Sequence, residues 1–552
     1  MLVAVRRQPE RWLFTGFVAL LLAPVITQGL DRPLASLAGS SPSGVALTVG
    51  GLVVALLGWL LTAACVERRR QLPWAATVVV AIAVGLAVDA HPPGVAALVA
   101  AAMSAVGLAR WLPPRTPPAV DGLIRRHRAL TGGYVLFALL SIVQVSRVSV
   151  FMADPARTDA QIIPGIEFLE HHSCLTAYVR ADELAHDGAL NLYRAELWPN
   201  AHEKAARPVT PFSPFDIDAY FYPPTFLLVA ELLAPLRGDY LAQRAAWFGL
   251  NGLLLAAALW IVARRLGGPR WHRPLLIAPL FFASLPVLLI LQVGNAQAAV
   301  VIISVLAMLS FELERPALGG FLLALATLSK VSPGILGVVL LAQRRDRAVA
   351  WTAGFGLLLL AVTATAYGLD PLVSWFRYTL PRLSSGEAFL EMLNHRESVP
   401  GNAAPFAWPF KLALLGVDVG DPWPIARRIS QAFTLLVVTL AVLSGRKHAA
   451  PAPGALTPRA LEWMALLFLT ALRSPFAPAY VLFAFVWAIT LWSAEVTGRR
   501  GGVALVLLFI AVTTAPPLPY TAQLIVFSSA QLLATSVAVW LLLRPRRRDA
   551  SA

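Results

Sequence analysis

The stretch LPVLLILQVGNAQAAVVIISVLAML, residues 285–309, indicates the class of fold to which this chain belongs. Apolar residues fill both sides of a polar break, Gln292-Val-Gly294-Asn295-Ala-Gln297, and neither side carries a charge. A helix of about 20 such residues crosses the ~30 Å hydrocarbon core of a bilayer. The stretch therefore predicts two membrane segments that meet at a polar break.

The composition extends this interpretation to the whole chain. Of its 552 residues, 58% are hydrophobic and 14% are charged, whereas soluble domains are roughly 45–50% apolar. The formal charge of +15 fits cytoplasmic loops that face anionic lipid, so we expect membrane lipid as a partner and no nucleic acid. We predict an all-α polytopic membrane protein with about 16 membrane segments and two large outer loops.

The predicted segments are apolar runs of roughly span length separated by polar connections. They are residues 12–30, 43–65, 73–89, 94–110, 130–152, 241–263, 273–293, 296–313, 316–329, 332–343, 349–367, 426–444, 459–473, 477–495, 502–518 and 521–543.

The domain organisation follows from these segments. It comprises a four-span module (1–120), a cytoplasmic linker (121–129), a core (130–367) with an outer loop at 153–240, a second outer loop (368–425), C-terminal spans (426–543) and a basic cytoplasmic tail (544–552).

The orientation follows from the basic residues, because short cytoplasmic loops retain Lys and Arg. With both termini cytoplasmic in the plasma (inner) membrane, 28 of the 45 Lys and Arg residues fall in inner connections. Both long polar loops then lie outside. This orientation requires that residues 220–236 form a re-entrant or surface-lying helix that does not cross the membrane.

The outer loop is the only long polar interval of the chain. Residues 151–239 hold 13 of the 30 acidic residues and four of the nine histidines. Tyr178-x-x-Ala-x-x-Leu-x-x-x-Gly188 predicts an amphipathic helix that ends at a glycine. Tyr220-Phe-Tyr222-Pro-Pro precedes an apolar run. Such aromatic clusters often only anchor a loop at the interface, but so many titratable groups indicate chemistry or gating on this side.

Positive charge at the outer face indicates an anionic substrate. Lys330 separates two apolar half-helices in Ser329-Lys330-Val-Ser332-Pro333, and a lysine at a bilayer centre costs about 2.5–3.5 kcal/mol unless it meets an anion or water. Snorkelling to a lipid headgroup is the alternative. Further basic side chains lie at the outer face against the topology rule: Arg377, Arg382, His395, Arg396 and Arg473.

The order of these motifs resembles the family 87 glycosyltransferases, membrane enzymes of the GT-C superfamily that include bacterial mannosyl- and arabinofuranosyltransferases. The similarity runs from about Leu130 to Leu543 and is most specific over Ala317–Arg347. Residues 1–120 lie outside it. The motifs are the Tyr178 helix, Tyr220-x-Tyr222-Pro-Pro, Gly294-Asn295-x-Gln297, Gly319-Gly320 leading to Lys330 and Pro333, Arg344-Arg-x-Arg347, and Ser474-Pro475 with Tyr480.

The resemblance implies a GT-C-like helical bundle and an inverting hexosyl- or pentosyltransferase. Such an enzyme would move a mannose- or arabinose-type sugar from a polyprenyl-phosphate donor to a cell-envelope glycan or glycolipid at the outer face. A carboxylate would act as general base, and nearby cations would stabilise the leaving phosphate.

The resemblance also indicates where in the sequence the general base is expected. In relatives it is usually an aspartate just ahead of the Tyr-x-x-Ala helix, where this chain has His171-His172-Ser-Cys174. Our catalytic candidates are Asp154, Asp159, Glu167 and His172. We favour Asp154 and Asp159, which follow a span end, although each could be only a helix cap or a solvated turn. The expected substrate-binding residues are Tyr178, Tyr222, Asn295, Gln297, Lys330, Arg377, Arg382, His395, Arg396 and Arg473.

No metal ligands or cofactor are expected, with a divalent cation left open. Adjacent His171 and His172 on a helix would point about 100° apart. Asp216 and Asp218 could bind a sugar or an ion, or form a solvated edge. Two rival functions remain: a flippase or transporter of lipid-linked sugar, and a non-catalytic family relative. We find no internal repeat of the kind that transporters often carry.

Overall fold

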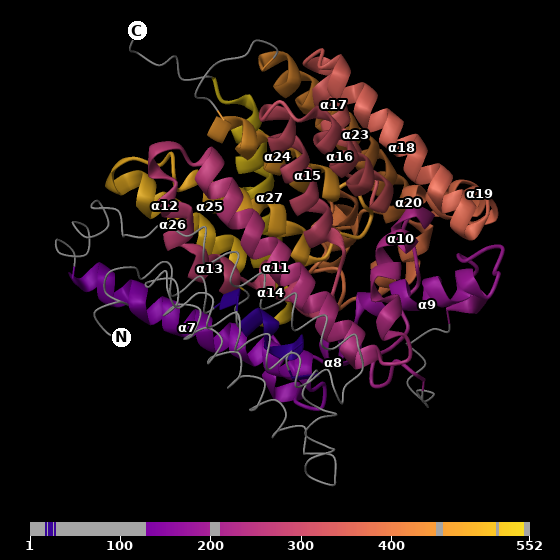
Figure 1. Ribbon diagram of the computed structural model, residues 1–552. Helices are drawn as coiled ribbons and strands as arrows, with labels where there is room; N and C mark the ends of the chain where they lie inside the picture. The colour runs from indigo at the N-terminus through magenta and orange to yellow at the C-terminus, as the bar shows by residue number, and fades with distance from the viewer. Residues whose placement is uncertain are drawn as a thin grey trace, which may run out of the picture.

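The computed structural model describes residues 17–18, 20–25, 27–28, 128–198, 210–448, 456–514 and 518–545. These residues form α-helices and short 3₁₀ or π turns, and no strand occurs among them, which confirms the all-α class (Figure 1). Nearly all of the predicted 1–120 module, residues 121–127 of the linker and residues 546–552 of the tail lie outside the described residues.

Five helices of the described part are long and apolar enough to cross a membrane. They are α7 (Arg128–Ala153), α11 (Tyr240–Leu266), α18 (Asp346–Tyr367), α23 (Pro422–Lys447) and α27 (Tyr520–Leu543). Each coincides with a predicted segment. The chain is therefore a helical membrane protein, and the total of about 16 segments stays a prediction.

The break at Gln292–Gln297 is confirmed. Helix α14 (Leu285–Val293) and helix α15 (Gln297–Glu312) meet at an angle of 112° and together form a sixth candidate span. Gly294 ends α14 in the left-handed conformation, with φ 68°. Its missing side chain matters, because a Cβ there would lie 3.3 Å from Cδ1 of Trp247.

The break at Lys330 is confirmed as well. Helix α16 (Pro316–Ser329) ends directly before Lys330, and helix α17 (Gly334–Ala342) begins four residues later. Helix α16 packs against both α15 and α18, and the three lie side by side in Figure 1. The packing places the end of α16 close to the polar residues of the first loop.

The predicted segment 273–293 is wrong as a single span. It forms three short helices, α12 (His272–Leu276), α13 (Ala278–Ala283) and α14. The reason is proline, since Pro274, Pro279 and Pro286 stand in the first turns of these helices. Proline lacks a backbone N–H and clashes with the preceding turn, so it starts helices and interrupts long ones.

The segment after Tyr222 is too short to cross. It consists of a 3₁₀ turn (Pro224–Phe226), α10 (Leu227–Ala230) and a second 3₁₀ helix (Glu231–Leu236). Its 13 residues fall below the length of about 17 that a span needs. This geometry fits the prediction that the segment is re-entrant or lies on the surface.

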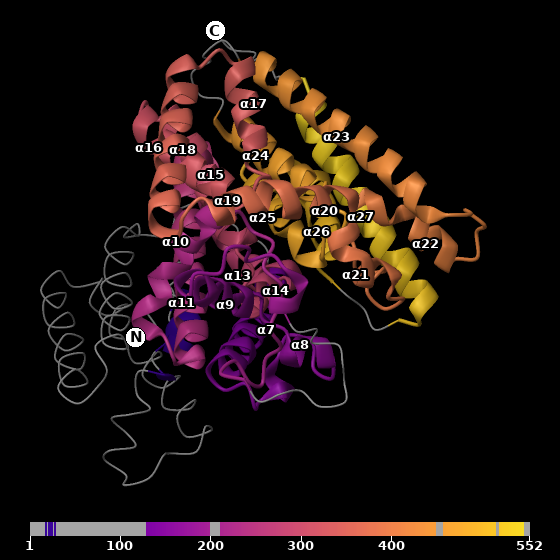
Figure 2. The same ribbon diagram turned by 90° about the vertical axis from the view of Figure 1, so that its right-hand side faces the viewer.

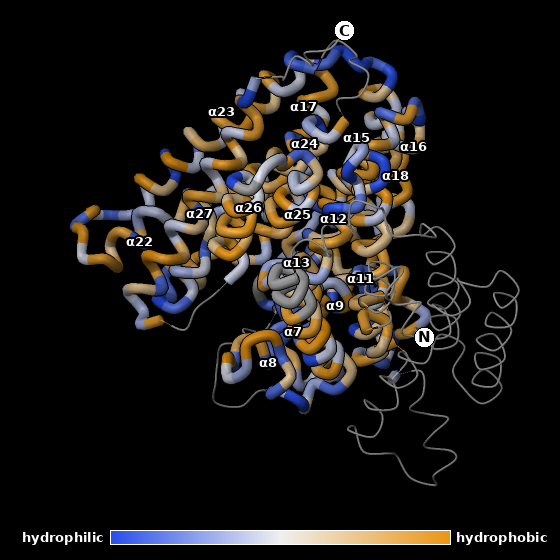
Figure 3. The backbone as a smooth tube through the Cα atoms, turned by 90° about the vertical axis from the view of Figure 1, so that its left-hand side faces the viewer, coloured by the Kyte–Doolittle hydropathy of each residue, from blue (hydrophilic) through white to orange (hydrophobic). Residues whose placement is uncertain are grey.

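Three further helices complete the bundle. Helices α24 (Leu456–Ala471) and α25 (Phe483–Trp492) are buried nearly throughout, including Trp463 and Trp487, whereas α26 (Gly498–Thr513) is partly exposed. A helix that is buried all round forms the interior of a bundle. In Figure 3 apolar residues dominate these helices.

The two polar loops contact each other and frame the site. The first contains α8 (Glu167–His171) and α9 (Cys174–His186), and the second contains α19 (Asp370–Ser374), α20 (Leu380–Ser385), α21 (Leu390–Asn394) and α22 (Trp408–Leu414). The indole N–H of Trp375 donates to the carbonyl of Phe221 at 3.2 Å. Figure 2 shows α9 and α10 next to α19.

Candidate active site

A pair formed by His172 and Asp218 lies at the start of α9. The Nδ1 atom of His172 is 3.2 Å from Oδ1 of Asp218. The hydroxyl of Thr176 fixes Asp218 by accepting its backbone N–H at 3.0 Å, and the N–H of Asp216 donates to the carbonyl of His171 at 2.8 Å. These bonds fold residues 214–218 back along the start of α9.

The surroundings keep His172 protonated. Burial opposes its charged form, but the carboxylate of Asp218 and the sulfur of Cys174 outweigh burial and hold the pKa of His172 well above its usual value. Nε2 of His172 is 3.5 Å from Sγ of Cys174, and the ring of Phe168 stacks on the imidazole at 4.3 Å. His172 is therefore an imidazolium beside the side chain of Asp218.

Tyrosines join α9 to the helix break at Gly294. The hydroxyl of Tyr178 donates to the hydroxyl of Tyr222 at 3.0 Å and accepts the backbone N–H of Ala296 at 3.0 Å. The side-chain amide of Asn295 lies 3.0 Å from the hydroxyl of Tyr480 and 3.3 Å from Sγ of Cys174. Helix α9, the break and the 3₁₀ helix Ala479–Leu482 that precedes α25 thus meet at one place.

Lys330 contributes a positive charge. Its Nζ lies 5.4 Å from the centre of the Tyr222 ring, and it makes no ion pair with a carboxylate of the described residues. Burial lowers the pKa of Lys330 to about 8, although the sulfur of Cys174 acts in the opposite direction. A partly buried cation without a carboxylate partner can bind an anion.

We call this assembly the His172 cluster. Its members are His172, Cys174, Tyr178, Asp218, Tyr222, Asn295, Lys330 and Tyr480. The sequence predicted five of them as site residues. Gln297 begins α15 beside the cluster, and its backbone N–H donates to Oδ1 of Asn295 at 2.9 Å.

The other predicted catalytic residues have different surroundings. Oδ1 of Asp154 accepts the N–H of Ala156 at 3.0 Å, which makes it a turn residue after α7. Both carboxylate oxygens of Asp159 pair with Arg157 at 3.0 Å, and the Asp159 side chain is 70% exposed. Glu167 lies exposed in the first turn of α8. The geometry favours the cluster over these three as the place of chemistry.

The predicted basic residues of the second half have partners of their own. Arg382 donates to the hydroxyl of Tyr378 at 2.6 Å and pairs with Glu387. The guanidinium of Arg396 lies 4.7 Å from the ring of Tyr520. Arg473 donates to the hydroxyl of Thr434 at 3.0 Å. Arg377 and His395 are exposed, and the roles of all five stay predictions.

Sequence reasoning did not include Asp218, Cys174 and Tyr480 among the site residues, although it considered Asp218 for binding a sugar or an ion and named Tyr480 in a family motif. Asp218 comes two residues before the Tyr220-x-Tyr222 motif, which was the available signal. Its pairing with His172 depends on the fold-back held by Thr176, which no local pattern reveals. Tyr480 joins the site because Asn402 of the second loop accepts the N–H of Ala477 at 2.9 Å and donates to the carbonyl of Pro475 at 3.0 Å.

Two sets of potential metal ligands occur in the described part of the chain. In each, the ligand atoms lie within 4.8 Å of one another. The first set is His172, Cys174 and Asp218, and the second is Asp182, His186 and Glu231. In the first set both imidazole nitrogens already face other members of the set, so an ion there would break the His172–Asp218 pair.

The fold and the site together define a class of protein. It is a helical membrane protein whose polar site, with the positively charged Lys330, lies where the first loop meets the helix breaks at Gly294 and Lys330. Residues 220–475 match the model of glycosyltransferase family 87. The match, which covers just under half of the chain, confirms the resemblance of this part to the family 87 glycosyltransferases. Tyr222, Asn295 and Lys330 lie within it.

Comparison with curated proteins and with solved structures found no match.

Proposed function

We propose that the protein transfers a mannose- or arabinose-type sugar from a polyprenyl-phosphate donor to a cell-envelope glycan or glycolipid. The observation that carries this proposal is the His172 cluster, which contains the Asp218 carboxylate and Lys330, a lysine without a carboxylate partner among the described residues. Lys330 and Asn295 lie in the part of the chain that matches family 87. The reaction takes place at the outer face of the plasma membrane, with both chain termini cytoplasmic.

Asp218 acts as the general base. Its side chain is 25% exposed, so an acceptor hydroxyl can reach it. The hydroxyl proton passes to Asp218 while the acceptor oxygen bonds to the anomeric carbon. The bond from that carbon to the phosphate oxygen breaks, and the polyprenyl phosphate leaves with the electron pair. A single displacement of this kind inverts the anomeric configuration.

His172 is a positioning residue for this step. Its raised pKa keeps it protonated at neutral pH, and its contact with Oδ1 orients the Asp218 side chain. We prefer Asp218 to Asp154, Asp159 and Glu167 because those three make turn or surface contacts.

Lys330 binds the donor phosphate. A preorganised cation stabilises negative charge that develops on a leaving group, and the effect is large in a dry site. The amide of Asn295 and the hydroxyls of Tyr178 and Tyr222 provide hydrogen-bonding groups beside it.

Lipid and glycan profiling of cells tests the proposal. Mass spectrometry would compare the wild type, Asp218→Asn, Lys330→Ala and Asp154→Asn. We expect the first two variants to accumulate the same under-glycosylated envelope species, and Asp154→Asn to match the wild type. Complete glycans together with a lipid-linked sugar that collects on the inner leaflet would instead support a flippase. Unchanged lipids and glycans in every variant would support a non-catalytic relative.

A further inference from the structure

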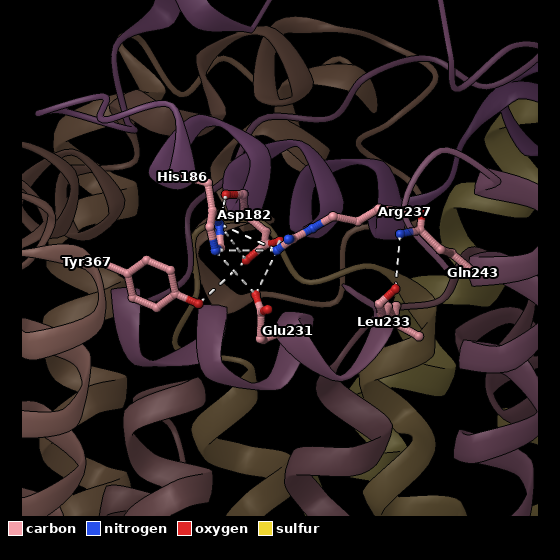
Figure 4. Close-up of polar contacts among 7 residues, drawn as sticks. All are labelled: Asp182, His186, Glu231, Leu233, Arg237, Gln243 and Tyr367. Atoms are coloured by element: carbon pink, nitrogen blue, oxygen red, sulfur yellow. Dashed lines mark hydrogen bonds and ion pairs between the residues drawn. The ribbon is translucent and has the colours of Figure 1, made fainter. Parts of the chain in front are cut away.

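A second polar cluster lies farther along α9, at its C-terminal end (Figure 4). Asp182 and His186 are four residues apart and so share one face of the helix. Glu231 begins the second 3₁₀ helix, and Arg237 follows its end. Three groups that can ligate a metal thus face one another from two separate parts of the outer loop.

The ligand atoms of this cluster converge on one point. Nη2 of Arg237 lies 2.6 Å from Oδ2 of Asp182, 2.8 Å from Oε2 of Glu231 and 3.5 Å from both ring nitrogens of His186. The three residues surround the position of a cation, and a guanidinium nitrogen stands there.

The orientation of His186 is that of a metal ligand. Its Nδ1 lies 2.9 Å from the backbone carbonyl oxygen of Asp182, and only a protonated nitrogen can pair with a carbonyl. Nε2 of the neutral ring therefore carries the lone pair, and it lies 3.8 Å from Oε2 of Glu231. Histidines that bind metals commonly donate their other N–H to a carbonyl or carboxylate.

The net charge of the cluster favours the binding of a further positive charge. Two carboxylates face one guanidinium, so one negative charge is in excess when His186 is neutral. Asp182 is 6% exposed and forms the floor, whereas Glu231, Arg237 and His186 are 40–45% exposed and form an open rim.

We propose that Asp182, His186 and Glu231 form a site for a divalent cation of the zinc class, for which Arg237 is the built-in competitor. Two carboxylate oxygens and one imidazole nitrogen suit Zn²⁺, and three protein ligands leave a position for water. The ion takes the place of the Arg237 guanidinium, which swings outward into solvent. This proposal does not depend on the transferase reaction.

The position of the site suggests what the ion does. Asp182 follows Tyr178 by one helical turn, a rise of about 6 Å, so the ion lies next to the His172 cluster. The hydroxyl of Tyr367, at the end of α18, reaches Oδ1 of Asp182 at 3.5 Å. The ion braces α9 against residues 231–237 and the end of a membrane helix.

Zinc binding to the full-length protein in detergent tests this site. Equilibrium dialysis would measure bound Zn²⁺ for the wild type and for His186→Gln, Glu231→Gln and Arg237→Gln. We expect one ion per chain, bound at least tenfold more tightly by Arg237→Gln than by the wild type. His186→Gln and Glu231→Gln weaken that binding at least tenfold. Both residues lie on the open rim, and thermal unfolding without zinc checks that each variant folds.

Cys174→Ser is the matched control, because Cys174 belongs to the other set of potential ligands. It should bind zinc as the wild type does. Loss of the ion in Cys174→Ser alone would place the metal in the His172 cluster and overturn the proposal. Equal binding by Arg237→Gln and the wild type would overturn the role of Arg237 as competitor.

Discussion

Asp218 differs from Asp159 in its partner and its exposure. It is three-quarters buried and pairs with an imidazolium inside the His172 cluster, whereas Asp159 pairs with Arg157 in open solvent. Water solvates Asp159 fully and screens its ion pair. Asp218 therefore lies in the less exposed setting of the two, inside the His172 cluster.

We predict that Asp218→Asn lowers kcat by about 10²–10⁴-fold, the usual contribution of a general base. The amide keeps the shape of the side chain but cannot take a proton, so KM for the donor should change little. Steady-state transfer assays measure both constants. Asp159→Asn is the control, with activity within about twofold of the wild type. A large loss of activity in Asp159→Asn with none in Asp218→Asn would reverse the assignment.

The titration of Lys330 predicts the dependence on pH. Its pKa is lowered from 10.5 to about 8 by burial, so it carries a charge at pH 7 and loses it as the pH rises through 8. We expect kcat/KM for the donor to fall above pH 8 for that reason. Lys330→Arg keeps its charge at every pH in this range, and so its profile should stay flat there. The same alkaline fall in Lys330→Arg would show that another group titrates.

The sequence could predict those site residues that belong to local motifs. Lys330 and Asn295 interrupt apolar runs, and Tyr178 lies on an amphipathic helix. Asp218 could not be assigned, because only the long-range bond to Thr176 brings it to His172. The preference for Asp154 and Asp159 rested on proximity to a span end, whereas their carboxylates bond to neighbours two residues away.

At the scale of elements, the site depends on the bend between α14 and α15. We predict that Gly294→Ala destabilises the protein by about 1–2 kcal/mol, because an L-residue pays that cost in the left-handed conformation. The new methyl group would also press on Trp247, whose indole N–H donates to the Gly294 carbonyl at 2.8 Å. Thermal unfolding in detergent measures the change.

Gly337→Ala is the matched control for this experiment. Gly337 lies inside α17 with nothing within 4 Å of the Cβ position, and alanine is the better helix former. Its unfolding temperature should equal that of the wild type or exceed it. If both variants unfold at the same temperature, the bend does not need glycine.

Helices were predictable where apolar runs lack proline. The runs at 349–367 and 521–543 coincide closely with α18 and α27, whereas three prolines divide the run at 273–293. The short helices of the second loop have no apolar periodicity of their own. Contacts such as the one between Trp375 and Phe221 hold them in place, and a sequence pattern does not contain that information.

At the scale of the whole molecule, hydropathy identifies the class of protein but not the number of spans. Helices α24 and α25 are apolar because other helices surround them, and burial in protein gives the same composition as burial in lipid. The orientation of the chain in the membrane rests on the distribution of Lys and Arg alone and stays a prediction.

Cysteine labelling of intact cells tests the orientation. Asp187→Cys is exposed after α9, and Arg347→Cys is exposed in the first turn of α18. We expect a membrane-impermeant maleimide to label Asp187→Cys from outside, and Arg347→Cys only after the membrane is opened. Labelling of the wild type, whose Cys174 is buried, gives the background. The opposite pattern would invert the predicted topology.

The central claim is glycosyl transfer from a lipid phosphate, and reconstitution tests it most directly. Purified protein in liposomes would receive polyprenyl-phosphate mannose or arabinose together with an envelope lipid extract, and mass spectrometry would follow both lipids. We predict that free polyprenyl phosphate and a glycosylated acceptor appear together, and that Asp218→Asn forms neither. Movement of intact lipid-linked sugar across the bilayer without any transfer would contradict the account.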